Sequence, residues 1–211
     1  MKDIIIRPYT LDDYNGLLSV QKEAFPAPFP EDLWWSKEQI QAHVQTFPGG
    51  ALLAVIDGTI IGSATSLLIT YKRKAHTWAE VADHGYIRGS HDPAGDSLYG
   101  IDVCVHPRYR GAGVATALYA ARKQFVLRHG LTRFIAGCRI PGFQRYEAEM
   151  SVETYVNKVS AGKLYDQVLS FMLRQGLQPL HILPNYLEDE ESCHFGILVE
   201  WTPGAHSRAK A

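Results

Sequence analysis

Residues 101–118 read Ile-Asp-Val-Cys-Val-His-Pro-Arg-Tyr-Arg-Gly-Ala-Gly-Val-Ala-Thr-Ala-Leu, and the fold follows from this stretch. Its first part continues an apolar run that starts at Leu98, which predicts a β-strand through Val105. Its last part opens a helix that we expect over residues 112–129, because apolar side chains recur on one face and Gly130 supplies a left-handed residue at the end. A strand therefore passes through a tight, glycine-rich turn directly into a helix.

The turn between this strand and this helix has the chemistry of a phosphate-binding site. The first N–H groups of a helix have no partner within the helix and lie at the positive end of its dipole. Gly111 and Gly113 would let a pyrophosphate approach the backbone, and Arg110 can add a charge-assisted hydrogen bond. The glycines alone are equally compatible with a turn that binds nothing. The turn is not a Walker A loop, since no Gly-Lys-Ser/Thr follows, and it lacks the GxGxxG of a dinucleotide site.

The rest of the chain alternates predicted strands with predicted helices. Asp57-Gly58 between two β-rich runs is a strong hairpin signal, so the strands on either side of it should be antiparallel. We expect strands at residues 4–8, 51–56, 59–70, 98–105, 133–138, 177–183 and 193–201, and helices at residues 11–24, 31–46, 112–129, 151–159 and 163–175. This order predicts an α/β fold around a sheet of mixed direction.

Length and composition fit one globular domain. The chain has 211 residues, of which 46% are hydrophobic and 20% are charged, and these values are ordinary for a protein with a buried core. We expect a single domain over residues 1–202, with insertions at 71–95 and 141–162, and a flexible tail at 203–211. A segment as long as residues 71–95 without a clear period is more often functional than incidental.

Charge and residue usage exclude several classes of partner. The formal net charge of -1 gives no bulk attraction to nucleic acid or to an anionic membrane. We find no signal peptide and no apolar stretch long enough to span a bilayer, so we expect a cytoplasmic protein. The cysteines, Cys104, Cys138 and Cys193, are odd in number, lack CxxC spacing and lie in apolar strand-like runs, so we expect buried thiols. The nine histidines form no ligand motif, and we expect no metal.

The sequence around the turn resembles motif A of the GNAT acetyltransferases. In that motif an Arg or Gln is followed at fixed spacing by Gly and then by Gly or Ala, and here these positions are Arg110, Gly113 and Ala115. The order of elements is similar to that family over nearly the whole chain. The resemblance implies the GNAT fold, with a mixed, mostly antiparallel central sheet of about seven strands flanked by helices.

A closer likeness is to the GNAT domain found fused ahead of carbon-nitrogen hydrolases. The segments that carry it are residues 78–88, His91-Asp92-Pro93, Leu98-Tyr99-Gly100-Ile101-Asp102-Val103, Arg139-Ile140-Pro141-Gly142-Phe143, Leu164-Tyr165-Asp166 and Leu183-Pro184-Asn185-Tyr186. No hydrolase accompanies the domain in this sequence, so both a free-standing enzyme and an excised or split partner fit.

The resemblance implies an acyl-CoA-dependent N-acyltransferase, with acetyl-CoA as co-substrate and an amine as acceptor. In that family the amine attacks the thioester directly, a base removes its proton, a strand N–H stabilises the oxyanion and an acid protonates the thiolate. Backbone groups of one strand bind the pantetheine arm, and amides of the turn hold the pyrophosphate. In this chain the strand residues are Val103, Cys104 and Val105, and the turn residues are Arg110, Gly111, Ala112, Gly113, Val114 and Ala115.

The catalytic acid and base are open in this sequence. Many family members carry the acid as a Tyr four residues before the glycine of the late helix, and here that position is Met172. Tyr165 is a candidate acid near the start of the same helix, although a half-buried helix tyrosine is the commoner explanation. Asp102 is a candidate base, and pairing with a neighbouring arginine is an equal alternative. Tyr99 is a weaker candidate, and Cys104 without a His partner is better explained as a core thiol.

Both insertions are expected on the acceptor side of the site. The first contains Trp78, His84, Tyr86 and His91, and the second contains Glu147, Glu149, Glu153 and Tyr155. The acidic residues suit a basic acceptor, although such a run is more often a solvated face. Two other functions fit the sequence less directly: a catalytically idle CoA-binding regulatory module that partners a hydrolase or another protein, and a phosphate-binding domain unrelated to CoA. The sequence is also compatible with a homodimer.

Overall fold

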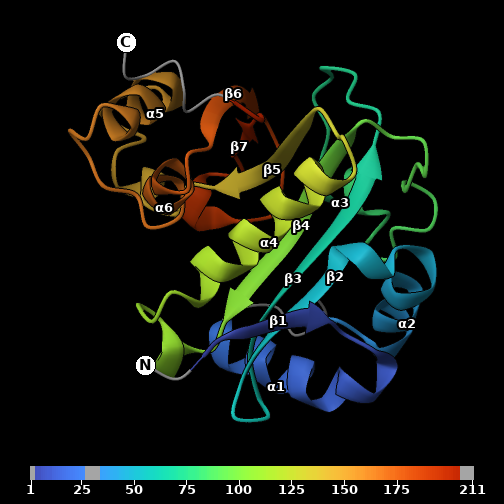
Figure 1. The fold of residues 1–211 in the computed structure, drawn as a ribbon. Coiled ribbons are helices and arrows are strands. Elements are labelled where there is room, and N and C mark those ends of the chain that lie inside the picture. Colours follow the sequence, from blue (N-terminus) through green and yellow to red (C-terminus); the bar gives the residue numbers. More distant parts are fainter. Residues whose placement is uncertain (1–2, 27–33, 205–211) are drawn as a thin grey trace.

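The computed structural model describes residues 3–26 and 34–204, and within them seven strands form one sheet (Figure 1). The strands lie in the order β1-β2-β3-β4-β5-β7-β6, and of the described neighbouring pairs only β4 and β5 run parallel. This architecture confirms the mixed, mostly antiparallel sheet flanked by helices. The strands are β1 (Ile5–Pro8), β2 (Ala51–Ile56), β3 (Thr59–Ile69), β4 (Ser97–Val105), β5 (Arg133–Arg139), β6 (Gln178–Leu183) and β7 (Gly196–Trp201).

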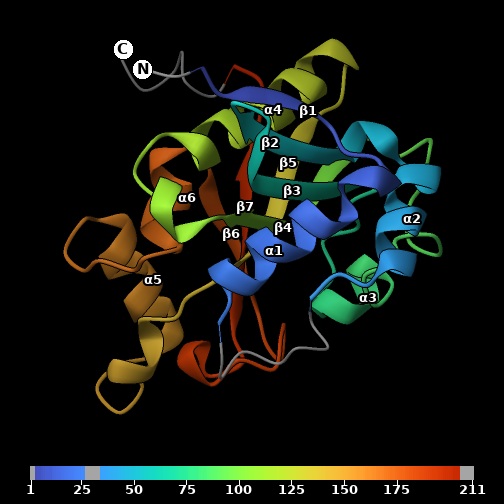
Figure 2. The same ribbon diagram turned by 90° about the horizontal axis from the view of Figure 1, so that it is seen from below.

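Helices cover both faces of this sheet (Figure 2). Side chains alternate along β4, so Cys104 packs with Val20 of α1, whereas Val105 packs in the cluster that contains Val114 of α4. The helices are α1 (Tyr14–Ala24), α2 (Lys37–Thr46), α3 (Trp78–Ala82), α4 (Val114–Arg128), α5 (Val152–Ser160) and α6 (Leu169–Arg174). Short 3-10 turns lie at Leu11–Asp13, Pro48–Gly50, Pro107–Tyr109, Phe143–Arg145 and Glu190–Ser192. No helix in the described part of the chain combines the length and the apolar character that crossing a bilayer requires.

The start of the second helix differs from the expected one. Residues 31–33 lie outside the described residues, and the described helix begins at Lys37. Ser36 explains this start, because its side-chain oxygen accepts a hydrogen bond from the N–H of Gln39 and so caps α2. Trp35 therefore precedes the helix, and its side chain lies in the core, where it is 5% exposed.

Residues 71–95 form part of the core and contain a short helix. Thr77 caps α3 by accepting a hydrogen bond from the N–H of Glu80. Ala82 and Ile87 are fully buried. This segment has no regular sequence period because its apolar residues pack from a short helix and successive turns rather than from one long element.

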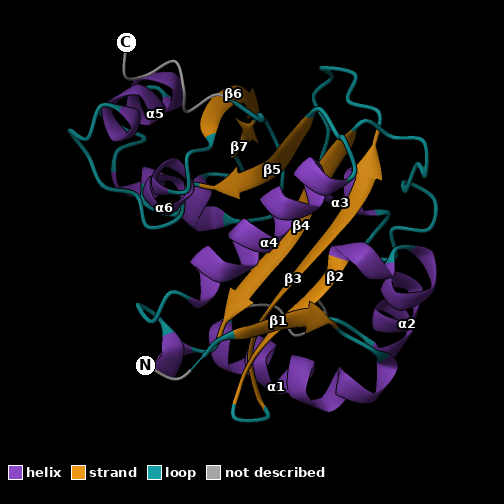
Figure 3. Ribbon diagram, viewed as in Figure 1, coloured by secondary structure: helices purple, strands orange, loops and turns teal. Residues whose placement is uncertain are grey.

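The sheet opens into a fork between β4 and β5. Their parallel pairing covers only residues 97–100 of β4 and 133–136 of β5. Beyond that point β4 stays with β3 as far as Val105, and β5 stays with β7 as far as Arg139, so the two strands separate (Figure 3). A bulge between Thr65 and Ser66 of β3 shifts the register beside the fork. Beyond the fork, the edge of β4 that faces β5 therefore has no strand partner.

The late helix is shorter than the expected span of 163–175, because α6 begins at Leu169. Asp166 sets this boundary. One carboxylate oxygen accepts hydrogen bonds from backbone N–H groups of the following turn, and the other accepts from the hydroxyl of Tyr155. The residues before Leu169 are consequently an irregular connection tied to the second insertion.

Two expectations near the C-terminus are also corrected. The last strand begins at Gly196 rather than at residue 193, and Cys193 ends a 3-10 turn with φ of 48°. Cys104 and Cys138 are buried as expected, whereas Cys193 is only partly buried, and all three are free thiols. Residues 205–211 of the expected tail lie outside the described residues.

Candidate active site

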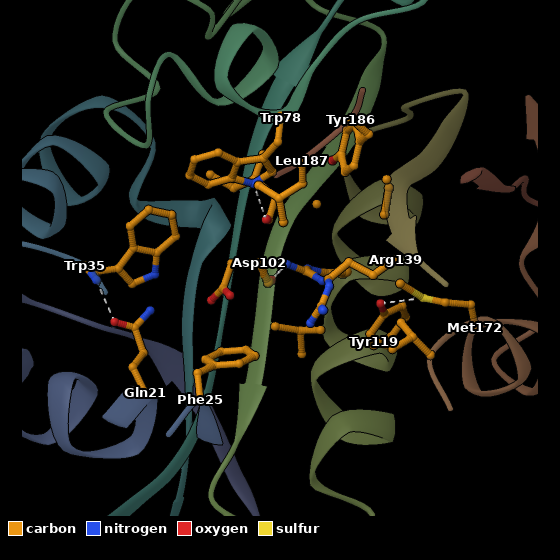
Figure 4. Close-up of a pocket in the computed structure, with 17 residues that line it drawn as sticks. Gln21, Phe25, Trp35, Trp78, Asp102, Tyr119, Arg139, Met172, Tyr186 and Leu187 are labelled. Carbon is orange, nitrogen blue, oxygen red and sulfur yellow. Dashed lines mark hydrogen bonds between the residues drawn. The ribbon is translucent and has the colours of Figure 1, made fainter. Parts of the chain in front are cut away.

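A cavity of about 200 Å³ lies at the fork between β4 and β5 (Figure 4). Aromatic side chains form much of its wall, namely Phe25, Trp35, Trp78, Tyr119 and Tyr186. Three charged residues also line it, namely Asp102, Arg122 and Arg139. Asp102 and Val103 are thus the members of the predicted site that reach this cavity. Trp35, Arg122 and Tyr186 come from distant parts of the chain, and sequence reasoning did not find them.

Asp102 is a carboxylate whose ionised form is favoured by the nearby indole of Trp35 and the N–H of Val103. Its Oδ2 atom is buried and has no hydrogen-bond partner among the described residues, and the same is true of Nε1 of Trp35. Figure 4 shows the carboxylate of Asp102 on the side of β4 that faces Trp35 and Gln21. Burial raises the pKa of Asp102 to about 6, against the opposing field of Arg122. A carboxyl group of this kind exchanges protons close to neutral pH.

The arginines of the cavity do not form an ion pair with Asp102. Arg122 is fully buried, and its guanidinium donates to the backbone oxygens of Asp102 and Thr65 and to Oγ of Ser66. Arg139 is paired with Asp189 at 2.5 Å. The alternative that Asp102 serves only to pair a neighbouring arginine is therefore not what the structure shows.

The glycine-rich turn has the shape expected of an anion site. Gly111 and Gly113 have φ of 81° and 88°, and a Cβ at either position would meet no other atom within 4 Å. Gly113 caps α4, and its carbonyl accepts the N–H of Ala117, so the N–H groups of residues 114–116 precede the hydrogen-bond ladder of the helix. The N–H of Ala112 is already bonded to Tyr109, and Arg110 donates to the carbonyl of Ala24 at the end of α1.

The predicted strand residues divide between the two faces of the sheet. Val103 lines the cavity, and its backbone belongs to the β4 edge beyond the fork. Cys104 is buried beside Ser63, and burial raises the pKa of its thiol, which agrees with a core thiol. The glycine turn, the end of β4 and the cavity at the fork thus belong to one strand–turn–helix segment and its junction with β5.

Tyr165 lies outside the cavity. Its side chain is 67% exposed, and it is not among the residues that line the fork. The physical reason is Asp166: its carboxylate turns inward to cap α6, so the neighbouring side chain points outward. Met172 does line the cavity, and its sulfur accepts a hydrogen bond from Tyr119. The structure therefore gives no support to Tyr165 as the acid.

The two insertions contribute unequally to the cavity. Trp78 from the first insertion lines it and donates its indole N–H to the carbonyl of Ile101 at 2.9 Å. None of the described residues 141–162 lines it. In that second insertion Tyr155 is bonded to Asp166, so the segment supports α6 rather than the acceptor side.

Comparison with known proteins identifies the relatives of this chain. Residues 14–145 match the acetyltransferase (GNAT) family. An uncharacterized N-acetyltransferase of Bacillus subtilis, YkwB, is 43% identical over 94% of this chain and 88% of its own length. A probable hydrolase of the same organism, YhcX, is 39% identical over 95% of this chain but only 39% of its own length. A GNAT-like decarboxylase, GphF, solved in complex with isobutyryl-CoA, has a TM-score of 0.74 at 23% identity and is covered over 98% of its length, with 94% of this chain.

Proposed function

Because the chain belongs to the GNAT acetyltransferase family, we propose that it transfers an acetyl group from acetyl-CoA to an amine by direct attack. The observation that carries the proposal is Asp102, a carboxylate with a raised pKa and no ion pair, which lies in the cavity at the fork. Acetyl transfer to an amine needs a base at this point, since an attacking amine must lose a proton.

The proposed binding site for the donor, acetyl-CoA, is formed by α4 and β4. The N–H groups at the start of α4 and the open space beside Gly111 and Gly113 suit the pyrophosphate of CoA. Beyond the fork β4 has no strand partner on the side of β5, although the carbonyls of Ile101 and Asp102 already accept from Trp78 and Arg122. The rest of this edge suits the amide groups of the pantetheine arm, which can bond to it as an added strand does. The thioester would then reach the cavity beside Val103.

The proposed binding site for the acceptor amine is formed by the aromatic wall of the cavity and Asp102. Phe25, Trp35 and Trp78 line the cavity beside the carboxylate, and the two indole rings stack at 5.9 Å. Aromatic faces and a carboxylate together attract a protonated amine before it is deprotonated. We therefore place the acceptor amine on this side of β4.

Asp102 can also supply the proton for the CoA thiolate, which Met172 cannot donate. A carboxyl group with a pKa of about 6 is mostly ionised at neutral pH and accepts the proton of the amine. Once protonated, it is a stronger acid than a thiol, whose ordinary pKa is about 8.5. It can therefore return that proton to the departing thiolate of CoA, which Met172 cannot do. We place this chemistry in the cytoplasm, where free thiols such as the three cysteines of this chain persist.

Release of the CoA thiol tests the proposed function. The protein is mixed with acetyl-CoA and a panel of aliphatic amines, ring-bearing amines and peptide N-termini, and the free thiol is followed with time. We expect release that requires both protein and amine and that saturates with the amine. Release without any amine would show a thioester hydrolase. Tight CoA binding without release would show a CoA-binding module without catalysis.

A further inference from the structure

Three hydrogen-bonded side chains lead out of the cavity at the fork. The hydroxyl of Tyr186, which lines this cavity, is 3.2 Å from the hydroxyl of Tyr99. The hydroxyl of Tyr99 is 2.9 Å from Nε2 of His76. His76 lines a second cavity of about 290 Å³, together with the exposed Lys72 and Lys74. The three side chains therefore connect the two cavities.

The inner part of this chain is shielded from solvent. Tyr99 is 0% exposed and Tyr186 is 3% exposed, whereas His76 is half-buried. A Cβ at Gly137 would lie 2.0 Å from the Tyr186 hydroxyl, so the glycine leaves the room that this hydroxyl occupies. Gly137 itself lines the cavity at the fork, which places the Tyr186 hydroxyl at the cavity wall (Figure 4).

The backbone fixes the direction of the hydrogen bonds. Nδ1 of His76 lies 3.0 Å from the carbonyl oxygen of Lys74, and a carbonyl can only accept, so Nδ1 carries the hydrogen. In a neutral imidazole Nε2 then has a lone pair, and the hydroxyl of Tyr99 donates to it. The single hydroxyl hydrogen of Tyr99 is already donated to Nε2 of His76, so the hydroxyl of Tyr186 donates to the oxygen of Tyr99. The Tyr186 oxygen is left with a lone pair that can accept a proton from the cavity.

We propose that Tyr186, Tyr99 and His76 form a relay that carries a proton from the cavity at the fork to the second cavity. The proposal rests on the proposed acyl transfer. An ammonium that becomes an amide loses two protons; one remains on the CoA thiol, and the other must leave. Tyr186 takes this proton from the substrate, passes its own proton to Tyr99, and Tyr99 passes its own to Nε2 of His76. Each oxygen ends with one hydrogen, and the imidazolium releases the proton to solvent.

The transfer along the tyrosines is concerted. Burial raises the pKa of both hydroxyl groups, so neither forms a free tyrosinate at neutral pH, and each gives up its proton as it receives one. Tyr186 is the member that meets the substrate, whereas Tyr99 and His76 act through it. The charged and titratable groups around His76 are Lys72 and Lys74 from its loop, Tyr71 from the end of β3, Glu80 from α3, Tyr99 from β4 and Tyr186 from the loop after β6.

The tautomer of His76 tests the relay without any substrate. Nitrogen NMR of the intact protein at pH 8, with the signal assigned by its loss in His76→Gln, should show the hydrogen on Nδ1. Tyr99→Phe removes the donor to Nε2 and should change the Nε2 signal. A hydrogen on Nε2 in the parent protein would overturn the proposal, because the hydrogen bond to Tyr99 would then point inward.

Turnover with the best amine provides the second test. Tyr186→Phe, Tyr99→Phe and His76→Gln should each lower kcat by about tenfold or more, with CoA affinity unchanged. Because the residues form one path, the double variant Tyr99→Phe/His76→Gln should be no slower than the slower single variant. Tyr14→Phe and His129→Gln, which lie outside both cavities, are the matched controls.

The possible outcomes distinguish failure of the proposed relay from failure of the proposed function. A parent that turns over, with kcat unchanged in Tyr99→Phe and His76→Gln, overturns the relay and leaves the proposed function standing. Additive losses in the double variant show separate structural roles and also overturn it. A parent that releases no thiol with any amine overturns the proposed function, and the relay with it.

Discussion

Asp166 and Asp102 differ in what surrounds their carboxylates, and the difference separates a structural residue from a reactive one. Asp166 receives hydrogen bonds at both oxygens, from backbone N–H groups and from Tyr155, so its burial is fully compensated. Asp102 has a buried oxygen without a hydrogen-bond partner among the described residues. A buried acceptor left unsatisfied costs roughly 1–3 kcal/mol, so Asp102 is held at a cost to stability. Such a cost is common at sites where a side chain is kept ready for a substrate.

Asp102→Asn should therefore stabilise the protein at high pH. The carboxyl group has its ordinary pKa of 3.8 in the unfolded chain and a pKa of about 6 in the folded protein. Because the folded state binds the proton more tightly, the parent loses stability as the pH rises through about 6, and asparagine does not. The unfolding free energy of the variant relative to the parent should increase by about 1–3 kcal/mol between pH 4 and pH 8. Urea denaturation at both pH values measures this, with the exposed Asp12→Asn as control, and a difference that is independent of pH would contradict it.

Asp166→Ala should have the opposite effect on stability. The substitution leaves the N–H groups at the start of α6 and the hydroxyl of Tyr155 without their acceptor. We expect the unfolding free energy to fall by about 2–4 kcal/mol at neutral pH. A loss below about 0.5 kcal/mol in urea denaturation, which is the range of ordinary surface substitutions, would show that Asp166 does not set the start of α6.

At the scale of elements, the site is a junction of β4 with α4 and a fork of β4 from β5. The junction could be predicted, because its glycines, its strand and its helix are contiguous in the sequence and each has a local signal. The fork could not, since it depends on where β5 leaves β4 for β7, which is a long-range pairing. Tyr165 shows the same limit: its direction depends on a contact between Asp166 and the second insertion that no local pattern reveals.

Gly113→Ala should weaken CoA binding at the start of α4. The residue has φ of 88°, so any side chain adds strain, and a methyl group would also occupy the open space beside the helix N-terminus. Gly162→Ala is the matched control, because Gly162 has φ of 69°, has equally open surroundings and lies outside the cavity. Both variants should lose similar stability, about 1–2 kcal/mol. Calorimetry should show CoA affinity reduced by tenfold or more for Gly113→Ala only; equal affinities in the two variants would remove the turn from the site.

At the scale of the whole molecule, the cavity is assembled from segments that are far apart in the chain. Trp35 precedes α2, Trp78 begins α3, and Tyr186 follows β6, yet all three line the fork. The N–H of Trp78 bonds to the carbonyl of Tyr186, which ties residues 71–95 to the C-terminal part of the sheet. Length and composition could predict one globular domain, and the alternation of strands and helices could predict an α/β fold, but the side chains that close the cavity meet only after folding.

Residues 71–95 are accordingly needed for folding as well as for the site. Deletion of this segment removes the fully buried Ala82 and Ile87 and the wall residue Trp78, so we expect loss of cooperative thermal unfolding and of CoA binding together. Trp78→Phe instead keeps a smaller aromatic ring and removes the hydrogen bond to Ile101. This variant should bind CoA normally and show a raised KM for the amine. A folded deletion variant that binds CoA would mean that the segment serves only the acceptor.

We propose above all that the carboxylate of Asp102 is the general base of acyl transfer in the cavity at the fork. The most direct measurement is kcat for the best amine in the parent, in Asp102→Asn and in the control Asp12→Asn, with CoA affinity determined by calorimetry on the same samples. We expect Asp102→Asn to lower kcat by about a hundredfold or more, because a positioned base contributes that much, while CoA affinity and the control stay at the parental values. A kcat for Asp102→Asn equal to that of the parent, in a protein that still binds CoA, would contradict it.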